Sequence, residues 1–264
     1  MSIEPKLLEI RKIARERGKY VMGKLFDDYL TGYFDKIRIP SCSFCGAEEN
    51  LTKEHIIPKW VFESNPKTSF KSDVNQLDQS YIKATIPLCG KCNSELFNAI
   101  EREVQKIISE VDLKKRYYSP EEWLIIIRWL EIIDFKFQVW DLRTDFKRHK
   151  KAEFIPFLSI FSIAFMRDGS VRTVTTKARM ARKRIATKDK TKNISSLIVG
   201  TTKNKSFNYF HTSNEFIFLE IPLHNKCFFY FYHREFKSDT QAKRAAMKII
   251  KSAFSDDKSE NPTT

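Results

Sequence analysis

The sequence predicts an α+β protein, in which helices flank a small cysteine-rich core and a strand-rich region follows. Two Cys-x-x-Cys pairs lie about 45 residues apart, and apolar residues after the second pair recur at three- and four-residue steps. From about residue 153, short β-branched and aromatic runs alternate with turn-like dipeptides. We therefore expect an N-terminal helical segment (1–39), a core (40–112), an α+β region with an antiparallel sheet (113–254) and a disordered tail (255–264).

The elements before residue 113 follow from local patterns. Residues 4–35 resemble one or two amphipathic helices with a break at Gly18. Leu51–Ile57 and Tyr81–Leu88 are β-rich and each adjoins a Cys-Gly turn, which predicts two strands of a hairpin. A helix with one apolar face should run from the second cysteine pair to about Asp112.

The later elements begin with a helix over Tyr117–Leu142, where Ser119 is the expected N-cap and Pro120 fits the first turn. A helix over Thr240–Phe254 should end the ordered chain. Between these helices, runs rich in β-formers predict strands over Phe154–Met166, Ser170–Thr176, Ile194–Thr201, Phe207–His211, Glu215–Ile221 and Lys226–His233. The many aromatic residues of the last strands are expected mainly at alternating core positions.

The cysteine pairs predict a structural zinc site, because four thiolates at this spacing suit closed tetrahedral coordination. Disulfides are the alternative, but the chain begins with a charged helical segment instead of a signal peptide. We therefore expect a reducing, cytoplasmic setting, with Cys227 as a small buried residue. The four expected zinc ligands are Cys42, Cys45, Cys89 and Cys92.

Glu54 and His55 lie between the two cysteine pairs and belong to neither. A carboxylate beside an imidazole supplies a hard-metal ligand and a base that titrates near neutrality, which together suit hydrolysis of a phosphodiester. Asn93 follows the last cysteine at the expected helix start, where it can cap the helix, bind a metal, or do both. For His55 the alternative is a solvated loop histidine. Glu95 and Glu101 are expected to be solvated helix positions, with a role as additional metal ligands as the alternative.

This ordered set of residues resembles the HNH endonucleases, the ββα-metal group that includes phage resolvases of the endonuclease VII kind. The matching features, over roughly residues 40–110, are the two cysteine pairs, Glu54-His55, the following Ile56-Ile57-Pro58 and Asn93. The resemblance implies His55 as general base, and Glu54 and Asn93 as ligands of one catalytic Mg²⁺ or Mn²⁺. It also implies that the four cysteines bind a structural zinc ion.

The sequence departs from the family pattern at Ala84, where a middle Asn commonly orients the base. Asn75, Gln76 or a backbone carbonyl is then needed to orient His55, or the site is impaired. The segment between the two hairpin strands is also long for the family, so residues 61–82 are interpreted as an insertion.

The net charge of +14 predicts attraction to a polyanion. No apolar stretch reaches transmembrane length, so nucleic acid is favoured over a membrane surface as the partner. Residues 172–192 hold nine basic residues and one acidic residue, a density suited to a phosphate backbone, although a solvated basic loop is the alternative. The expected phosphate contacts are Arg179, Arg182, Lys183 and Arg184.

The function predicted from the sequence is therefore a metal-dependent HNH endonuclease that hydrolyses double-stranded DNA, in a setting such as restriction or phage defence. A zinc-ribbon protein that binds nucleic acid without cutting it is the alternative, motivated by Ala84. An interaction module that uses zinc only to fold would explain the cysteines but neither Glu54-His55 nor the charge. The sequence does not decide whether the protein forms a homodimer.

Overall fold

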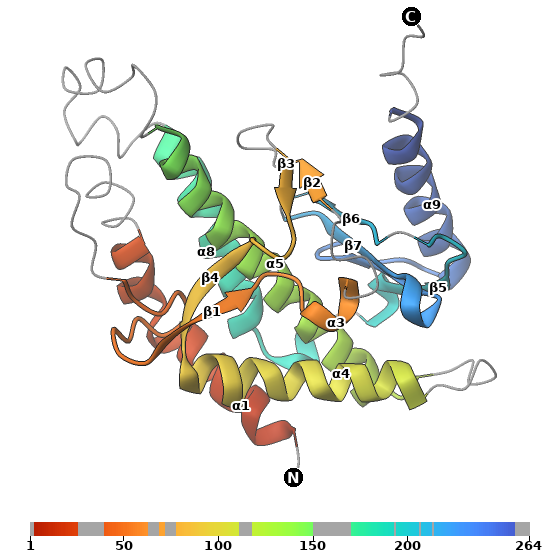
Figure 1. Cartoon of the computed structure of the whole chain (residues 1–264). Helices are drawn as coiled ribbons and strands as arrows, with labels where there is room; N and C mark the ends of the chain where they lie inside the picture. The colour runs from red at the N-terminus through yellow and green to blue at the C-terminus, as the bar shows by residue number, and fades with distance from the viewer. Residues whose placement is uncertain are drawn as a thin grey trace, which may run out of the picture. The chain divides into compact units, whose positions relative to one another are not determined.

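The computed structural model describes residues 3–25, 40–62, 69–71, 78–110, 118–149, 170–192, 194–205, 207–212 and 214–256 (Figure 1). The chain forms two compact units, Met1–Thr191 and Lys192–Thr264. The first unit contains the cysteine-rich core and two long helices, α5 (Pro120–His149) and α8 (Ser170–Ala186). The residues of both helices fall in the region 113–254 that was expected from the sequence.

The core is built on an antiparallel strand pair followed by a helix. Strand β1 (Leu51–His55) pairs with β4 (Thr85–Cys89), with Leu51 opposite Cys89 and His55 opposite Thr85. Both predicted strands are confirmed but are shorter than expected, and residues 81–83 form a turn. The chain leaves β4 directly into the next helix.

That helix begins with a wide turn. Residues Lys91–Phe97 form the π-helical segment η1, and α4 (Asn98–Glu110) continues it. The amide of Asn98 donates to the carbonyl of Asn93, which is the five-residue spacing of a π-turn. The predicted apolar face is confirmed, because its residues Leu96, Phe97, Ile100, Val104, Ile107 and Ile108 are buried.

The segment expected as an insertion carries short elements of its own. Helix α3 (Lys59–Phe62) follows β1, and β2 (Ser69–Lys71) pairs antiparallel with β3 (Asp78–Ser80). Trp60 of α3 stacks on Trp129 of α5, with ring centroids 5.6 Å apart. This stacking holds the start of the segment against helix α5.

Helix α5 begins where the sequence predicts and runs seven residues further than expected. Its start is closed by a capping box, in which the Glu122 amide donates to Ser119 Oγ and the Ser119 amide donates to the Glu122 carboxylate. The helix packs against α4, β4 and α8, so it is enclosed on several sides. Charged residues in its middle, among them Arg128, Glu131 and Asp134, are therefore buried.

The strand predicted over Ser170–Thr176 is wrong, because these residues begin α8. Its β-branched residues favour a strand locally, but Thr175, Ala178, Ala181 and Ile185 recur at helical spacing and are buried. The contacts that bury them come from α5 and from α1 (Glu4–Glu16). Tertiary packing therefore overrides the local preference.

The N-terminal segment is confirmed as two helices. Helix α1 ends at Glu16, Arg17 interrupts it, and residues 18–25 form a second helix, so the break lies one residue before the predicted Gly18. Arg11 and Arg128 both bind Asp189, in the 3-10 turn η2 (Asp189–Thr191) that follows α8. These ion pairs join α1, α5 and the end of α8.

The second unit is an antiparallel sheet with a helix, as predicted. Strands β5 (Leu197–Thr201), β6 (Tyr209–Thr212), β7 (Phe216–Ile221) and β8 (Lys226–Phe231) lie in the order β5-β8-β7-β6. The short helices η3 (Ile194–Ser196) and η4 (Pro222–His224) join them, and α9 (Asp239–Asp256) ends the unit. Aromatic residues of β7 and β8 form a core with Ala246 of α9, as expected from their alternation.

Several predictions lie outside the described residues, including the strand Phe154–Met166, the helical residues 26–35 and most of the tail. The first two residues of the predicted tail, 255 and 256, are helical instead. Among the helices that the structure describes, none has the length and apolarity needed to cross a membrane.

Candidate metal centre and functional site

The four predicted zinc ligands come together in one cluster. The Sγ atoms of Cys42, Cys45, Cys89 and Cys92 all lie within 4.8 Å of one another, and Cys45 and Cys89 are 3.6 Å apart. At a Zn–S distance of about 2.3 Å, the edge of a tetrahedron measures about 3.8 Å. The cluster therefore has the dimensions of a closed tetrahedral metal site.

The first cysteine pair is held by a tight turn. The Gly46 amide donates to the Cys42 carbonyl, and the Cys45 amide lies 3.5 Å from Cys42 Sγ. Gly46 has a φ of +82°, and a Cβ there would come within 2.5 Å of the Tyr20 ring. Only glycine meets both conditions, because other residues rarely adopt this φ and would strike the ring.

The charge of the cluster explains why it needs a cation. Hydrogen bonds from Cys45 and Cys92 hold the pKa of Cys42 well below its usual range. Through the same contacts, Cys42 raises the pKa of Cys45 to about 11 and raises that of Cys92 further. A bound divalent cation would compensate four thiolates and let all of them ionise.

Glu54, the predicted ligand of the catalytic metal, is joined to a lysine. Its carboxylate accepts a hydrogen bond from Lys136 Nζ at 2.5 Å. The same ammonium donates to Glu101 at 3.0 Å and to the backbone carbonyl of His55 at 3.1 Å. The expectation that Glu101 is solvated is therefore wrong, because its side chain is 15% exposed and takes part in an ion pair.

Lys136 was missed by the sequence analysis. Its side chain is 0% exposed, and although burial opposes its charge, Glu101 and Glu54 outweigh that effect and raise its pKa above the usual range. The ammonium is thus a permanent cation between two carboxylates. The available signal was a lysine within the apolar helix α5, at a position where solvent exposure was not expected.

His55, the predicted general base, ends β1 with a half-buried ring. Burial and the nearby Lys59 lower its pKa, which favours the neutral imidazole. The backbone of Ile82 forms a hydrogen bond that raises the pKa of His55, so a carbonyl accepts from the ring. This contact comes two residues before Ala84, whose own carbonyl accepts from the Ile56 amide.

Of the groups considered for orienting His55, a backbone group near the ring is the one found among the described residues, at Ile82. The side-chain alternatives, Asn75 and Gln76, lie outside the residues that the structure describes. A main-chain acceptor can fix the ring orientation and tautomer as a side-chain amide would.

Asn93 lies in the first turn of η1 and reaches back to β1. Its Nδ2 donates to Thr52 Oγ1 at 2.8 Å, which leaves Oδ1 as the atom suited to bind a cation. Thr52 and Glu54 are two residues apart and so share one face of the strand, and His55 is the last residue of β1. The structure thus sets Asn93 beside the face of β1 that carries Glu54.

The four predicted phosphate contacts on α8 fall into two pairs. Arg179 and Lys183 are exposed, whereas Arg182 and Arg184 are 3% and 6% exposed. Arg182 donates to the backbone carbonyls of Ala14 and Ile13, and Arg184 forms an ion pair with Asp134. These bonds give the buried pair a structural role, so of the four predicted phosphate contacts only Arg179 and Lys183 are open to solvent.

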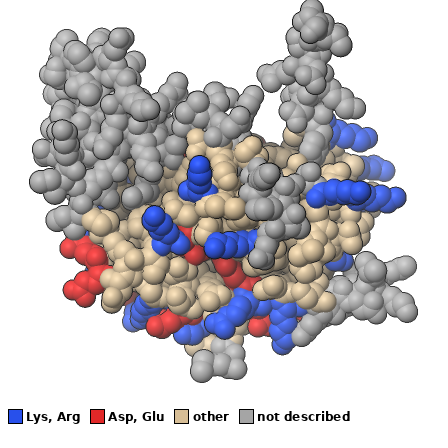
Figure 2. Space-filling model, in the orientation of Figure 1, with Lys and Arg blue, Asp and Glu red and all other residues tan. Residues whose placement is uncertain are grey.

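Arg182 also lies near the cysteine cluster. Its guanidinium carbon is 4.9 Å from the ring centroid of Phe44, which lies between Cys42 and Cys45. Burial lowers the pKa of Arg182 to about 10 against the opposing effect of the thiols, so the group stays charged at neutral pH. Elsewhere, Lys and Arg side chains are scattered among acidic ones on the face drawn in Figure 2, with no single gathered patch there.

Comparison of the chain with protein-family models, with curated proteins and with solved structures finds no match.

Proposed function

We propose that this protein is a metal-dependent endonuclease of the HNH type, which hydrolyses phosphodiester bonds in DNA. The observation that carries the proposal is the order in which the parts of the cysteine-rich core follow one another along the chain. The Glu54-His55 pair ends β1, the partner strand β4 runs through Cys89 into a helix, and Asn93 lies in the first turn of that helix. A strand pair, a helix and a four-cysteine cluster in this order suit a ββα-metal core.

In the proposed mechanism, the neutral His55 takes a proton from water while the resulting hydroxide attacks phosphorus and the 3′ oxygen leaves. The Ile82 backbone holds the ring in position for this transfer. Mg²⁺ or Mn²⁺ held by Glu54 and Asn93 would supply positive charge at the phosphate. Glu54 has one oxygen bonded to Lys136, and its other oxygen is the candidate metal ligand. The resemblance implies products with 5′-phosphate ends.

The test is incubation of purified protein with plasmid DNA and Mg²⁺ or Mn²⁺. We predict that His55→Ala lowers the cleavage rate by roughly 10² to 10⁴-fold, the usual contribution of a positioned general base. DNA affinity should change little, because phosphate contacts remain. Equal cleavage by parent and variant would remove His55 from the mechanism.

Metal ligation is tested separately with Glu54→Ala and Asn93→Ala. Each should raise the concentration of Mn²⁺ needed for half-maximal cleavage, because each removes one oxygen ligand. Glu49→Ala is the matched control, since Glu49 is an exposed carboxylate in the loop before β1. An unchanged metal dependence in both variants would refute the assignment.

A second candidate is a zinc-ribbon protein that binds nucleic acid without cutting it. Two observations favour it, the absence of the usual Asn at Ala84 and the ion pair that holds Glu54 to Lys136. The plasmid assay separates the two candidates. A protein of the second kind would bind the plasmid in the presence of zinc and of Mg²⁺ or Mn²⁺, and would leave it intact.

A further inference from the structure

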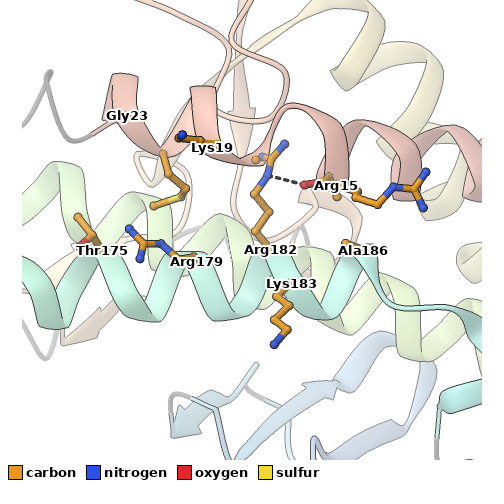
Figure 3. Close-up of a pocket in the computed structure, with 11 residues that line it drawn as sticks. Arg15, Lys19, Gly23, Thr175, Arg179, Arg182, Lys183 and Ala186 are labelled. Atoms are coloured by element: carbon orange, nitrogen blue, oxygen red, sulfur yellow. Dashed lines mark hydrogen bonds between the residues drawn. The ribbon is translucent and has the colours of Figure 1, made fainter.

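A groove in the first unit is formed by the N-terminal helices and α8 (Figure 3). It has a volume of about 810 Å³ and lies between residues 14–23 on one wall and residues 175–186 on the other. Its floor includes small or apolar residues such as Ala14, Gly18 and Met22.

The described charged residues that line the groove are all cationic. Arg15 and Lys19 lie on one wall, and Arg179, Arg182 and Lys183 lie on the other. Arg15, Lys19 and Gly23 are spaced four residues apart across the break at Arg17, and Thr175, Arg179 and Lys183 have the same spacing along α8, so each row follows one side of its segment. Figure 3 shows Arg15 and Lys19 on the helical segment that faces α8.

Arg182 lines the groove but is held by the protein itself. It is 3% exposed, and its Nε and Nη2 donate to the carbonyls of Ala14 and Ile13. Its Nη1 is buried as well, and its guanidinium lies 4.9 Å from the Phe44 ring, beside the cysteine cluster. The cations of the groove that are open to a ligand are therefore Arg15, Lys19, Arg179 and Lys183, which are all exposed.

The shape of the groove selects among phosphate-bearing ligands. The groove is an open channel on the surface of two packed helices, and its volume of about 810 Å³ is too small to take up a duplex, which is wide enough to hold a whole α-helix in its major groove. An extended single strand can lie along it. The stretch from residue 15 to residue 23 spans about 12 Å at 1.5 Å per residue, which is the length of about three to four nucleotides stacked at 3.4 Å.

We propose that this groove binds a single-stranded segment of nucleic acid, with its phosphates on the exposed cations Arg15, Lys19, Arg179 and Lys183. The apolar floor contacts sugars and base faces. The inference rests on the proposed function for the identity of its ligand, and it adds an unpaired segment to the expected substrate. Binding here depends on the N-terminal helices as much as on α8.

The experiment measures binding and not cleavage. Full-length His55→Ala protein is titrated against a fluorescent eight-nucleotide single strand and against a blunt duplex of the same sequence, at several salt concentrations. The groove variant adds Arg15→Glu, Lys19→Glu and Arg179→Glu. The control variant adds Lys83→Glu, Arg102→Glu and Lys106→Glu, which are exposed cations of the same unit outside the groove.

The groove variant should lose single-strand affinity at least tenfold more than the control variant. Its plot of log affinity against log salt should flatten by up to about 2, because each lost single-strand contact contributes about 0.7. Equal losses in the two variants would mean that only net charge matters and would overturn the proposal. So would an unchanged affinity, or a duplex that binds as tightly as the strand with the same dependence on the groove.

Free phosphate is the other anion that could occupy the groove, and competition with inorganic phosphate or a mononucleotide tests this alternative. If either displaces the strand at micromolar concentration, the groove is a small-anion site and the strand proposal fails. Plasmid cleavage by the parent protein is scored independently. A protein that binds the strand through the groove but never cuts DNA refutes the proposed nuclease and leaves this inference standing.

Discussion

Replacing Lys136 with methionine should destabilise the first unit strongly. The lysine side chain is 0% exposed and its ammonium lies 2.5 Å from Glu54 and 3.0 Å from Glu101, whose side chains are only 13% and 15% exposed. Lys136→Met keeps most of the apolar stem but leaves two close carboxylates without their cation. Removal of one partner of a buried ion pair costs about 3–5 kcal/mol, so the free energy of unfolding should fall by about that amount.

Urea unfolding followed by tryptophan fluorescence measures this change in the correct unit, because all four tryptophans lie within Met1–Thr191. At an m value of about 3 kcal/mol per molar urea, a loss of 3–5 kcal/mol lowers the midpoint by about 1–1.7 M. Lys83→Met is the control, because Lys83 is exposed and its change should stay within about 0.5 kcal/mol.

A triple variant distinguishes lost charge pairing from lost packing. Combining Lys136→Met with Glu54→Gln and Glu101→Gln removes the unpaired charges and should recover more than half of the lost stability. The reasoning is refuted if Lys136→Met unfolds within about 0.3 M urea of the parent, a shift below 1 kcal/mol at this m value. It is also refuted if the triple variant is no more stable than the single one.

The remaining predictions concern the cysteine cluster. Gly46→Ala should cost about 1–3 kcal/mol in the same urea titration, because it combines a φ of +82° with a contact to the Tyr20 ring. Gly90→Ala should be neutral or stabilising by up to about 1 kcal/mol, since Gly90 has a φ of −51° and nothing lies near its missing Cβ. Equal losses in both variants would contradict this. Cys89→Ser should lose the metal and unfold the unit, because structural zinc contributes about 10–16 kcal/mol of apparent binding energy in small peptides. Elemental analysis should find one zinc per parent chain and none in this variant, and a folded, zinc-free parent would refute the assignment.

The features that the sequence predicts well depend on neighbouring residues. Examples are the turn at Cys42 and Cys45, the N-cap at Ser119 and the alternating aromatics of the last strands, which are all encoded within a few positions. The cysteine cluster joins segments far apart in the chain, yet it was predicted because thiolate spacing carries its own chemistry.

The features that the sequence did not reveal depend on distant partners. Lys136 meets Glu54 across 82 positions of the chain, and no local pattern marks such a pair. Charge also misled the interpretation of α8, because Arg182 and Arg184 were counted as solvent-facing although each binds a buried acceptor. In the same helix, β-branched residues favoured a strand until packing against α5 and α1 is taken into account.

The bond between Arg182 and the carbonyl of Ala14 has a consequence for how the chain is made. It joins residues 168 positions apart, and α8 is the main helical neighbour of α1. At a synthesis rate of about 5–20 residues per second, α8 leaves the ribosome on the order of 10–30 s after α1. During that interval the apolar side of α1, including Ile10 and Ala14, has no partner from α8 to cover it. In newly made protein this side of α1 is therefore open to chaperones and to aggregation until α8 is complete.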